Sequence, residues 1–319
     1  MRNSKGQLIV VYILMPLLIL SFFMSSLVFF VNQPARNQDS DFSGLRAFET
    51  LDARPVSLMC KYTSGNWYQE MQSVKADFDD YNSLYGNRLS IHVATGNAAT
   101  LNQMKSYIST TERMHLASHG TYVDNDPKIT MYGGYLTPNI VGEWSLTNGL
   151  CKVIYLSACN GMGHNGQLDT DLADMLRTHT SVNAVIGFKD VANILGATLL
   201  SQSFWGYHVT LTSTGGYSTA SSFSHTYDRI VTKLDFIKSI ISLEIDLIVA
   251  LILELCETGV GAIFVGVLLA EITTVQVLDA LLGDAIDTVH SWEIVGDSVP
   301  GLSWSTGGGG GHGGEDTMD

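Results

Sequence analysis

The stretch that decides the fold is residues 153–161, which read VIYLSACNG. Its first five residues form a short apolar run of the length expected for a buried strand. Cys159 follows that run, and Gly161 after it permits a tight turn. Residues 113–120, RMHLASHG, repeat the arrangement, with His119 and Gly120 at the end of an apolar run. Each stretch therefore predicts a strand that carries a reactive side chain at its carboxyl end.

The regions around these two stretches have the same alternating organisation. Further strands are predicted at 55–60, 88–95 and 184–188, and helical patterns at 67–85, 98–108 and 168–176. Apolar strands that alternate with helices are typical of a parallel sheet covered on both faces. We therefore predict an α/β fold with a mostly parallel central sheet and helices on both faces. Ligands of such sheets bind beyond the carboxyl ends of the strands, where His119 and Cys159 are expected.

Composition and charge exclude several functional classes. The chain has 17 Lys and Arg against 31 Asp and Glu, a net charge of −14. Nucleic acid is therefore not expected as a partner, because phosphate binding needs clustered cations. The four cysteines are too few for a disulfide scaffold and include no CxxC pair. A disulfide between two of Cys60, Cys151 and Cys256 stays open if the domain lies outside the cytoplasm.

The amino-terminal region has the pattern of a membrane anchor. Residues 8–31 carry no charge over 24 positions, and a helix of that length spans about 36 Å. Because Arg2 and Lys5 precede the run, we expect residues 1–31 to anchor the chain in a membrane, with the remainder extracytoplasmic. Cleavage of this segment as a signal peptide, which would secrete the protein, is the alternative. Residues 32–53 read as a polar linker.

The carboxyl-terminal region differs in composition from the rest. Residues 236–282 are very apolar but are interrupted by acidic residues, and the longest uncharged stretch there, 258–270, has 13 residues. That stretch is too short to span a bilayer, so we expect two long helices that pack on the domain or on a partner chain through residues 236–290. A membrane-inserting hairpin stays open. We assign residues 233–300 to an apolar helical appendage and 301–319 to a flexible Gly-rich tail.

The residue types at the two strand ends suit nucleophilic catalysis. The Cys159 thiolate is a good nucleophile, and the His119 imidazole can donate a proton to a leaving amine. Gly120 has no Cβ, so its backbone N–H can approach a substrate carbonyl oxygen. We expect this N–H and that of Cys159 to form an oxyanion hole.

His-Gly after one strand and Ala-Cys-x-Gly after the next resemble the caspase-like cysteine peptidases of clan CD. The stretch 153–161 is similar to the versions found in CHAT-domain and legumain-type proteins. The resemblance covers residues 54–232, and the 40-residue separation of His119 and Cys159 suits a strand, a helix and a return strand. It implies a peptide or protein substrate, a Cys159/His119 dyad and no cofactor.

The resemblance also implies where the substrate side chain binds. In this family the specificity pocket is fed by the end of the first strand, by residues beside the cysteine and by the segment after the fifth strand. Those regions are Cys60–Lys61, Ser157 and Lys189–Asp190. Asp190 would receive a basic P1 side chain, whereas Lys189 would favour an acidic one. We expect Asp190 and Ser157 to bind substrate.

Other interpretations of the same residues remain. His115, His119, Cys159 and His164 offer zinc-type donors, but Leu116 stands where a zincin helix has its essential Glu. We expect His115 to be a hydrogen-bonded core histidine. In a different functional class, the chain would be a catalytically silent caspase-like scaffold or a membrane-active effector that uses its apolar carboxyl-terminal helices.

Overall fold

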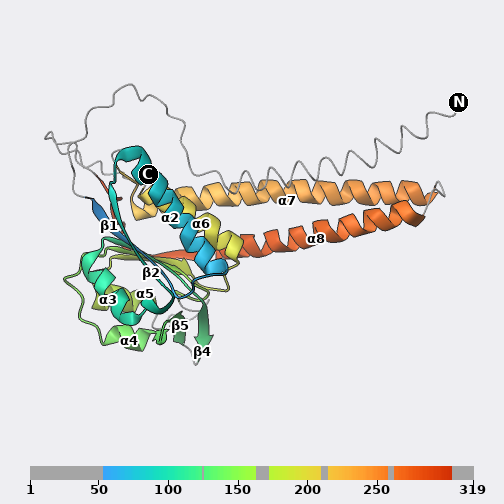
Figure 1. Ribbon diagram of the computed structural model, residues 1–319. Coiled ribbons are helices and arrows are strands. Elements are labelled where there is room, and N and C mark those ends of the chain that lie inside the picture. The colour runs from blue at the N-terminus through green and yellow to red at the C-terminus, as the bar shows by residue number, and fades with distance from the viewer. Residues whose placement is uncertain (1–52, 124–125, 163–171, 210–214, 258–261, 304–319) are drawn as a thin grey trace, which may run out of the picture. The chain divides into compact units, whose positions relative to one another are not determined.

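The computed structural model describes residues 53–123, 126–162, 172–209, 215–257 and 262–303 (Figure 1). Within it a six-stranded sheet has the order β2-β1-β3-β7-β8-β9. The strands are β1 (Arg54–Cys60), β2 (Leu89–Thr95), β3 (Arg113–Ala117), β7 (Val153–Ser157), β8 (Ala184–Phe188) and β9 (Trp292–Gly296). The first five in chain order pair in parallel, and β9 is antiparallel to β8. The prediction of a mostly parallel central sheet is confirmed.

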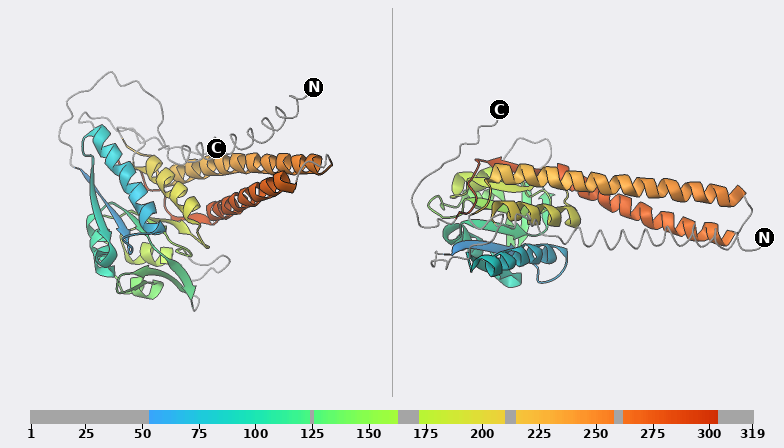
Figure 2. Two further views of the ribbon diagram at one scale, coloured as in Figure 1. Left: turned by 45° about the vertical axis from the view of Figure 1, so that its right-hand side comes forward. Right: turned by 90° about the horizontal axis from the view of Figure 1, so that it is seen from above.

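Helices cover both faces of this sheet. On one face lie α2 (Asn66–Tyr85) and α6 (Ile194–His208), with the adjoining parts of α7 (Thr219–Glu257) and α8 (Ala262–His290). On the other lie α3 (Leu101–Thr110), α4 (Pro138–Gly142) and α5 (Leu172–His179) (Figures 1 and 2). Strand β7 contributes side chains to both layers of the core. Val153 and Tyr155 belong to one apolar cluster, and Ile154 and Leu156 belong to the other. Burial on both faces explains why the strands are continuous apolar runs.

The connection from His119 to Cys159 differs from the expected strand, helix and return strand. It contains a second, three-stranded sheet of β4 (Gly120–Val123), β5 (Asp126–Met131) and β6 (Gly134–Leu136), all antiparallel, followed by the short α4. Strand β5 buries alternate residues, so only one of its faces contributes to the core. This sheet starts at Gly120, directly after the expected catalytic histidine.

The two long helices predicted near the carboxyl terminus are present, but they are not separate from the α/β core. Helix α7 begins at Thr219 and runs across the expected boundary at 232/233. Strand β9, which we assigned to the appendage, completes the central sheet. Farther along, α7 and α8 pack on each other through a small apolar cluster that includes Ile248, Leu268 and Val275.

The expected membrane anchor, residues 1–31, lies outside the described part of the chain, as do the linker through residue 52 and the tail from residue 304. Within the described ranges, no helix combines the length and the apolar character that crossing a membrane requires.

Candidate active site

His119 lies two residues after the end of β3, and two aromatic side chains contact its ring. The Trp67 indole N–H donates a hydrogen bond to His119 Nδ1 at 3.1 Å. The Trp67 ring meets the imidazole edge-on at a centroid distance of 5.8 Å, and Tyr62 does so at 5.3 Å. Both aromatics come from the region where the chain leaves β1 and enters α2. Gly65 allows that entry because its φ of 82° lies in the left-handed region.

Cys159 lies beyond the end of β7, in a tight turn bound to the end of β8. Asn160 adopts a left-handed φ of 52°, which asparagine tolerates better than most residues. Its N–H donates to the Asp190 carbonyl at 3.0 Å, and the N–H of Met162 donates to Phe188. Cys159 Sγ accepts from the Ala192 N–H at 3.3 Å and donates to the Ala192 carbonyl at 3.7 Å. The backbone of Ala192 therefore contacts the sulfur on both its donor and its acceptor side.

Burial sets the state of this thiol more than any neighbour does. Desolvation raises the pKa of Cys159 above its ordinary value, and the nearby Asp190 carboxylate acts in the same direction. The backbone hydrogen bond at Ala192 opposes that shift without overcoming it. Cys159 is thus a thiol, not a thiolate, in the arrangement described.

Gly120 brings the two strand ends into direct contact. A Cβ at position 120 would lie 1.8 Å from the Cys159 carbonyl oxygen and 3.1 Å from the Cys159 nitrogen. Only glycine allows the backbone after His119 to come this close to the backbone of Cys159. The two residues expected to form the oxyanion hole are therefore adjacent.

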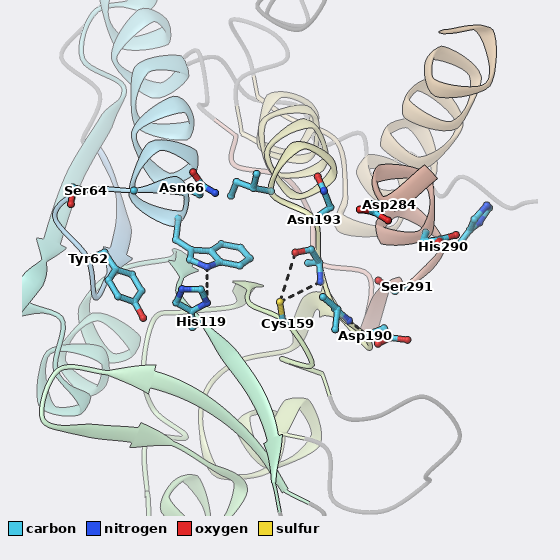
Figure 3. Close-up of a pocket in the computed structure, with 16 residues that line it drawn as sticks. Tyr62, Ser64, Asn66, His119, Cys159, Asp190, Asn193, Asp284, His290 and Ser291 are labelled. Carbon is cyan, nitrogen blue, oxygen red and sulfur yellow. Dashed lines mark hydrogen bonds between the residues drawn. The ribbon is translucent and has the colours of Figure 1, made fainter. Parts of the chain in front are cut away.

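His119 and Cys159 line one cleft of about 1140 Å³ at the carboxyl ends of the parallel strands (Figure 3). Segments after β1, β3, β7 and β8 contribute to it, together with the end of α8. Figure 3 shows the His119 and Cys159 side chains, and its dashed lines mark the hydrogen bonds of His119 with Trp67 and of Cys159 with Ala192. The sequence prediction that both reactive groups face a single cleft agrees with this geometry.

The expected specificity residues have different positions. Asp190 lines the cleft, and its carboxylate accepts a hydrogen bond from the Val191 N–H at 2.8 Å. Ser157 is fully buried in β7 and is absent from the cleft wall. Lys189 is also absent from the wall and forms an ion pair with Glu293 of β9 at 2.5 Å. Asp190 alone of these three is placed to meet a substrate.

His115 is the core histidine that the sequence predicted. It is completely buried and accepts at Nδ1 from the Trp205 indole N–H at 3.1 Å. An indole N–H only donates, so His115 carries its proton on Nε2 and donates it to Glu70 at 3.2 Å. Because Trp67 and Glu70 both belong to α2, this helix contacts both histidines of the β3 region.

The alternative chemistries find little support in the described residues. No group of three or more His, Cys, Asp or Glu side chains among them is arranged to hold a metal ion, while His164 lies outside them. Cys60 and Cys151 are free and buried, so they do not form the disulfide that the sequence left open between them.

Sequence reasoning missed most of the cleft wall. It placed Trp67 at the start of a helix but had no signal for its contact with His119. Tyr62 and Ala192 flank segments that the resemblance did single out, Cys60–Lys61 and Lys189–Asp190. Asp284, Asp287 and His290 belong to α8, more than 120 positions after Cys159, and nothing local in the sequence points to them.

No protein-family model and no curated protein matches the sequence. Among solved structures, the chain is similar to the crystal structure of the Arg-specific cysteine proteinase gingipain R, with a TM-score of 0.36 and 13% sequence identity. The alignment covers 48% of this chain and 36% of that one, so the chain spans about a third of the neighbour's length.

Proposed function

We propose that this protein is a cysteine endopeptidase with a caspase-like core, in which Cys159 is the nucleophile and His119 the general acid. One observation carries the proposal: a thiol and an imidazole at the ends of the neighbouring strands β7 and β3 open into one cleft. The contact of Gly120 with the Cys159 backbone supports an oxyanion hole made of their two N–H groups.

The proposed reaction needs only these groups and water. The thiol proton passes to His119, and the sulfur attacks the scissile carbonyl carbon, so that an S–C bond forms while the oxyanion hole binds the oxygen. The C–N bond then breaks as His119 returns the proton to the leaving amine. Water, deprotonated by His119, hydrolyses the thioester and releases the acid and Cys159.

For the substrate we propose peptides with a basic P1 residue. Asp190 lines the cleft, and Asp284 and Asp287 of α8 line it as well. No Lys or Arg lines the cleft within the described residues, and the Lys189 ammonium is paired with Glu293. Carboxylates at this wall favour a cationic side chain over an acidic one. We also propose that the enzyme is extracytoplasmic. Residues 1–31 either anchor it in a membrane or are cleaved as a signal peptide, which would secrete it.

The test is peptide hydrolysis by the full-length chain in mild detergent under reducing conditions. We expect Cys159→Ala and His119→Ala each to lower kcat/KM by at least about 1,000-fold, as for other catalytic units. Cys151→Ala, which removes a thiol outside the cleft, should retain activity. Matched peptides with Arg, Lys, Asp or Asn at P1 should be cleaved fastest at Arg or Lys. Hydrolysis that survives Cys159→Ala would overturn the mechanism, and a preference for Asp would overturn the assignment of Asp190.

A second candidate is a catalytically silent scaffold that binds a partner chain through its long helices. The observation in its favour is that Phe236, Leu243 and Leu247 of α7 are at least 60% exposed, which is unusual for apolar side chains along one helix. Loss of biological activity on replacing these three by Gln, together with full activity of Cys159→Ala, would favour the scaffold over the peptidase.

A further inference from the structure

Neither member of the proposed dyad is ready for catalysis in the arrangement described. The Cys159 thiol is engaged with the backbone of Ala192 on both its donor and its acceptor side. His119 is engaged through Nδ1 with Trp67. Burial keeps the thiol protonated, and the indole N–H occupies one ring nitrogen of the imidazole, whereas the proposed reaction passes through a thiolate and an imidazolium.

The contact with Trp67 determines where His119 carries its proton. An indole N–H is a donor only, so Nδ1 must accept, and a neutral imidazole that accepts at Nδ1 is protonated at Nε2. Imidazolium carries a proton on both nitrogens. Protonating His119 at Nδ1 would set two donors against each other, so the hydrogen bond from Trp67 would have to break.

From this geometry we infer that Trp67 is a latch that occupies Nδ1 of His119 and keeps the proposed peptidase latent. It acts through the histidine and is a positioning residue, not a catalytic one. Release of the indole from Nδ1 then precedes transfer of the thiol proton. The inference rests on the proposed function for its consequence, while the state of the imidazole is independent of any substrate.

The surroundings of Trp67 keep the latch in place. The side chain is only 6% exposed, and it lies one helical turn before Glu70, which accepts from the buried His115. The Glu70–His115 contact anchors the first turns of α2 against β3. Trp67 is therefore held against the His119 ring by its own helix.

The latch is tested with Trp67→Phe, which keeps an aromatic ring and removes the N–H. The matched control is Trp144→Phe, because Trp144 is also buried but its indole N–H has no hydrogen-bond partner among the residues that the structure describes. Long-range ¹H–¹⁵N spectra of histidine-labelled protein at neutral pH should show that Nδ1 of His119 is unprotonated in the wild type and in Trp144→Phe. In Trp67→Phe we expect a mixture of the two tautomers.

Alkylation of Cys159 by iodoacetamide at neutral pH, located by peptide mass analysis, is the second measurement. Trp67→Phe should react about five- to tenfold faster, which corresponds to losing one opposing neutral hydrogen bond. An unchanged tautomer, or a rate no faster than that of Trp144→Phe, would overturn the latch. Neither the tautomer nor the alkylation rate depends on peptide cleavage. Failure of the latch proposal can therefore be distinguished from failure of the proposed peptidase function. If the phenylalanine variant does not fold, benzothienylalanine at position 67 keeps the bicyclic shape and removes only the N–H.

Discussion

At the scale of single residues, the close approach of Gly120 to the Cys159 backbone leaves no room for a side chain at position 120. In Gly120→Ala the new Cβ would meet backbone atoms of Cys159 at 1.8 and 2.8 Å, and backbone cannot move aside as a flexible side chain can. We expect the free energy of unfolding to fall by about 1–3 kcal/mol, as for other overpacked sites. Displacing the nucleophile should also lower peptide turnover by about 100-fold.

Gly134→Ala is the control for this substitution. Its Cβ would find Leu101 as its nearest neighbour at 4.0 Å, an ordinary contact, and it belongs to the same small sheet. Urea unfolding and peptide turnover should both match the wild type. If Gly120→Ala behaved like Gly134→Ala, the close approach of the two strand ends would be wrong.

The residues of the site were predictable only in part. His119, Cys159 and Asp190 each follow a strand whose apolar run is plain in the sequence, and the edge rule for parallel sheets brings such residues together. Trp67 contacts His119 through its indole N–H, and Ala192 contacts Cys159 through its backbone N–H and carbonyl. Neither kind of contact leaves a pattern in the sequence. Ser157 is close to Cys159 in sequence, but it lies inside β7, where helices cover both faces of the sheet, whereas Cys159 lies beyond the end of the strand.

At the scale of elements, a buried hydrogen bond between Glu70 and His115 ties α2 to β3. Glu70→Ala would leave the Nε2–H of His115 without an acceptor in a fully buried position. The expected loss in the free energy of unfolding is about 1–3 kcal/mol for the unpaired donor, in addition to the cost of the cavity. Glu70→Gln keeps an oxygen that accepts and should stay within about 1 kcal/mol of the wild type. Equal urea midpoints for the two variants would show that the hydrogen bond does not anchor the helix.

Elements were predicted well where apolar runs are continuous and poorly where they are not. Strands β1, β2, β3, β7 and β8 begin and end within about two residues of the predicted ranges. Strands β4 and β6 are three or four residues long and half-buried, so their side chains give too weak an alternation. Strand β9 follows two long helices, and its pairing with β8 spans about a hundred residues that local patterns cannot bridge.

At the scale of the whole molecule, His208 links folding to pH. It accepts from the Arg113 guanidinium at 2.8 Å and donates to the Tyr217 carbonyl at 2.8 Å. Burial, followed by the charge of Arg113, lowers the pKa of His208 from 6.5 to about 3. Between these two pH values the unfolded chain binds a proton that the folded chain does not. This group's contribution to stability is therefore full above pH 6.5 and falls as the pH falls, by up to about 1.4 kcal/mol per unit.

We expect His208→Gln to be less stable than the wild type at neutral pH, because it disturbs two buried hydrogen bonds, but to lose less stability on acidification. Asp77 acts in the opposite sense, because burial raises its pKa to about 6 and favours the folded state in acid. Comparing wild type and variant at each pH cancels that contribution. Urea unfolding across this range is the measurement, with the exposed His92→Gln as the control. Parallel pH profiles for wild type and His208→Gln would contradict the assignment.

The order in which the chain supplies its parts has a consequence for synthesis. Cys159 and His119 lie in the first half of the chain, but one wall of their cleft comes from α8 and the last strand of the sheet is β9. A ribosome that has translated both reactive residues has not yet made that wall or that edge strand. The proposed nucleophile is thus synthesised before its cleft can be complete. Helix α2, which carries the proposed latch Trp67, is synthesised long before α8 and β9. The latch would therefore keep the incomplete chain inactive during that interval.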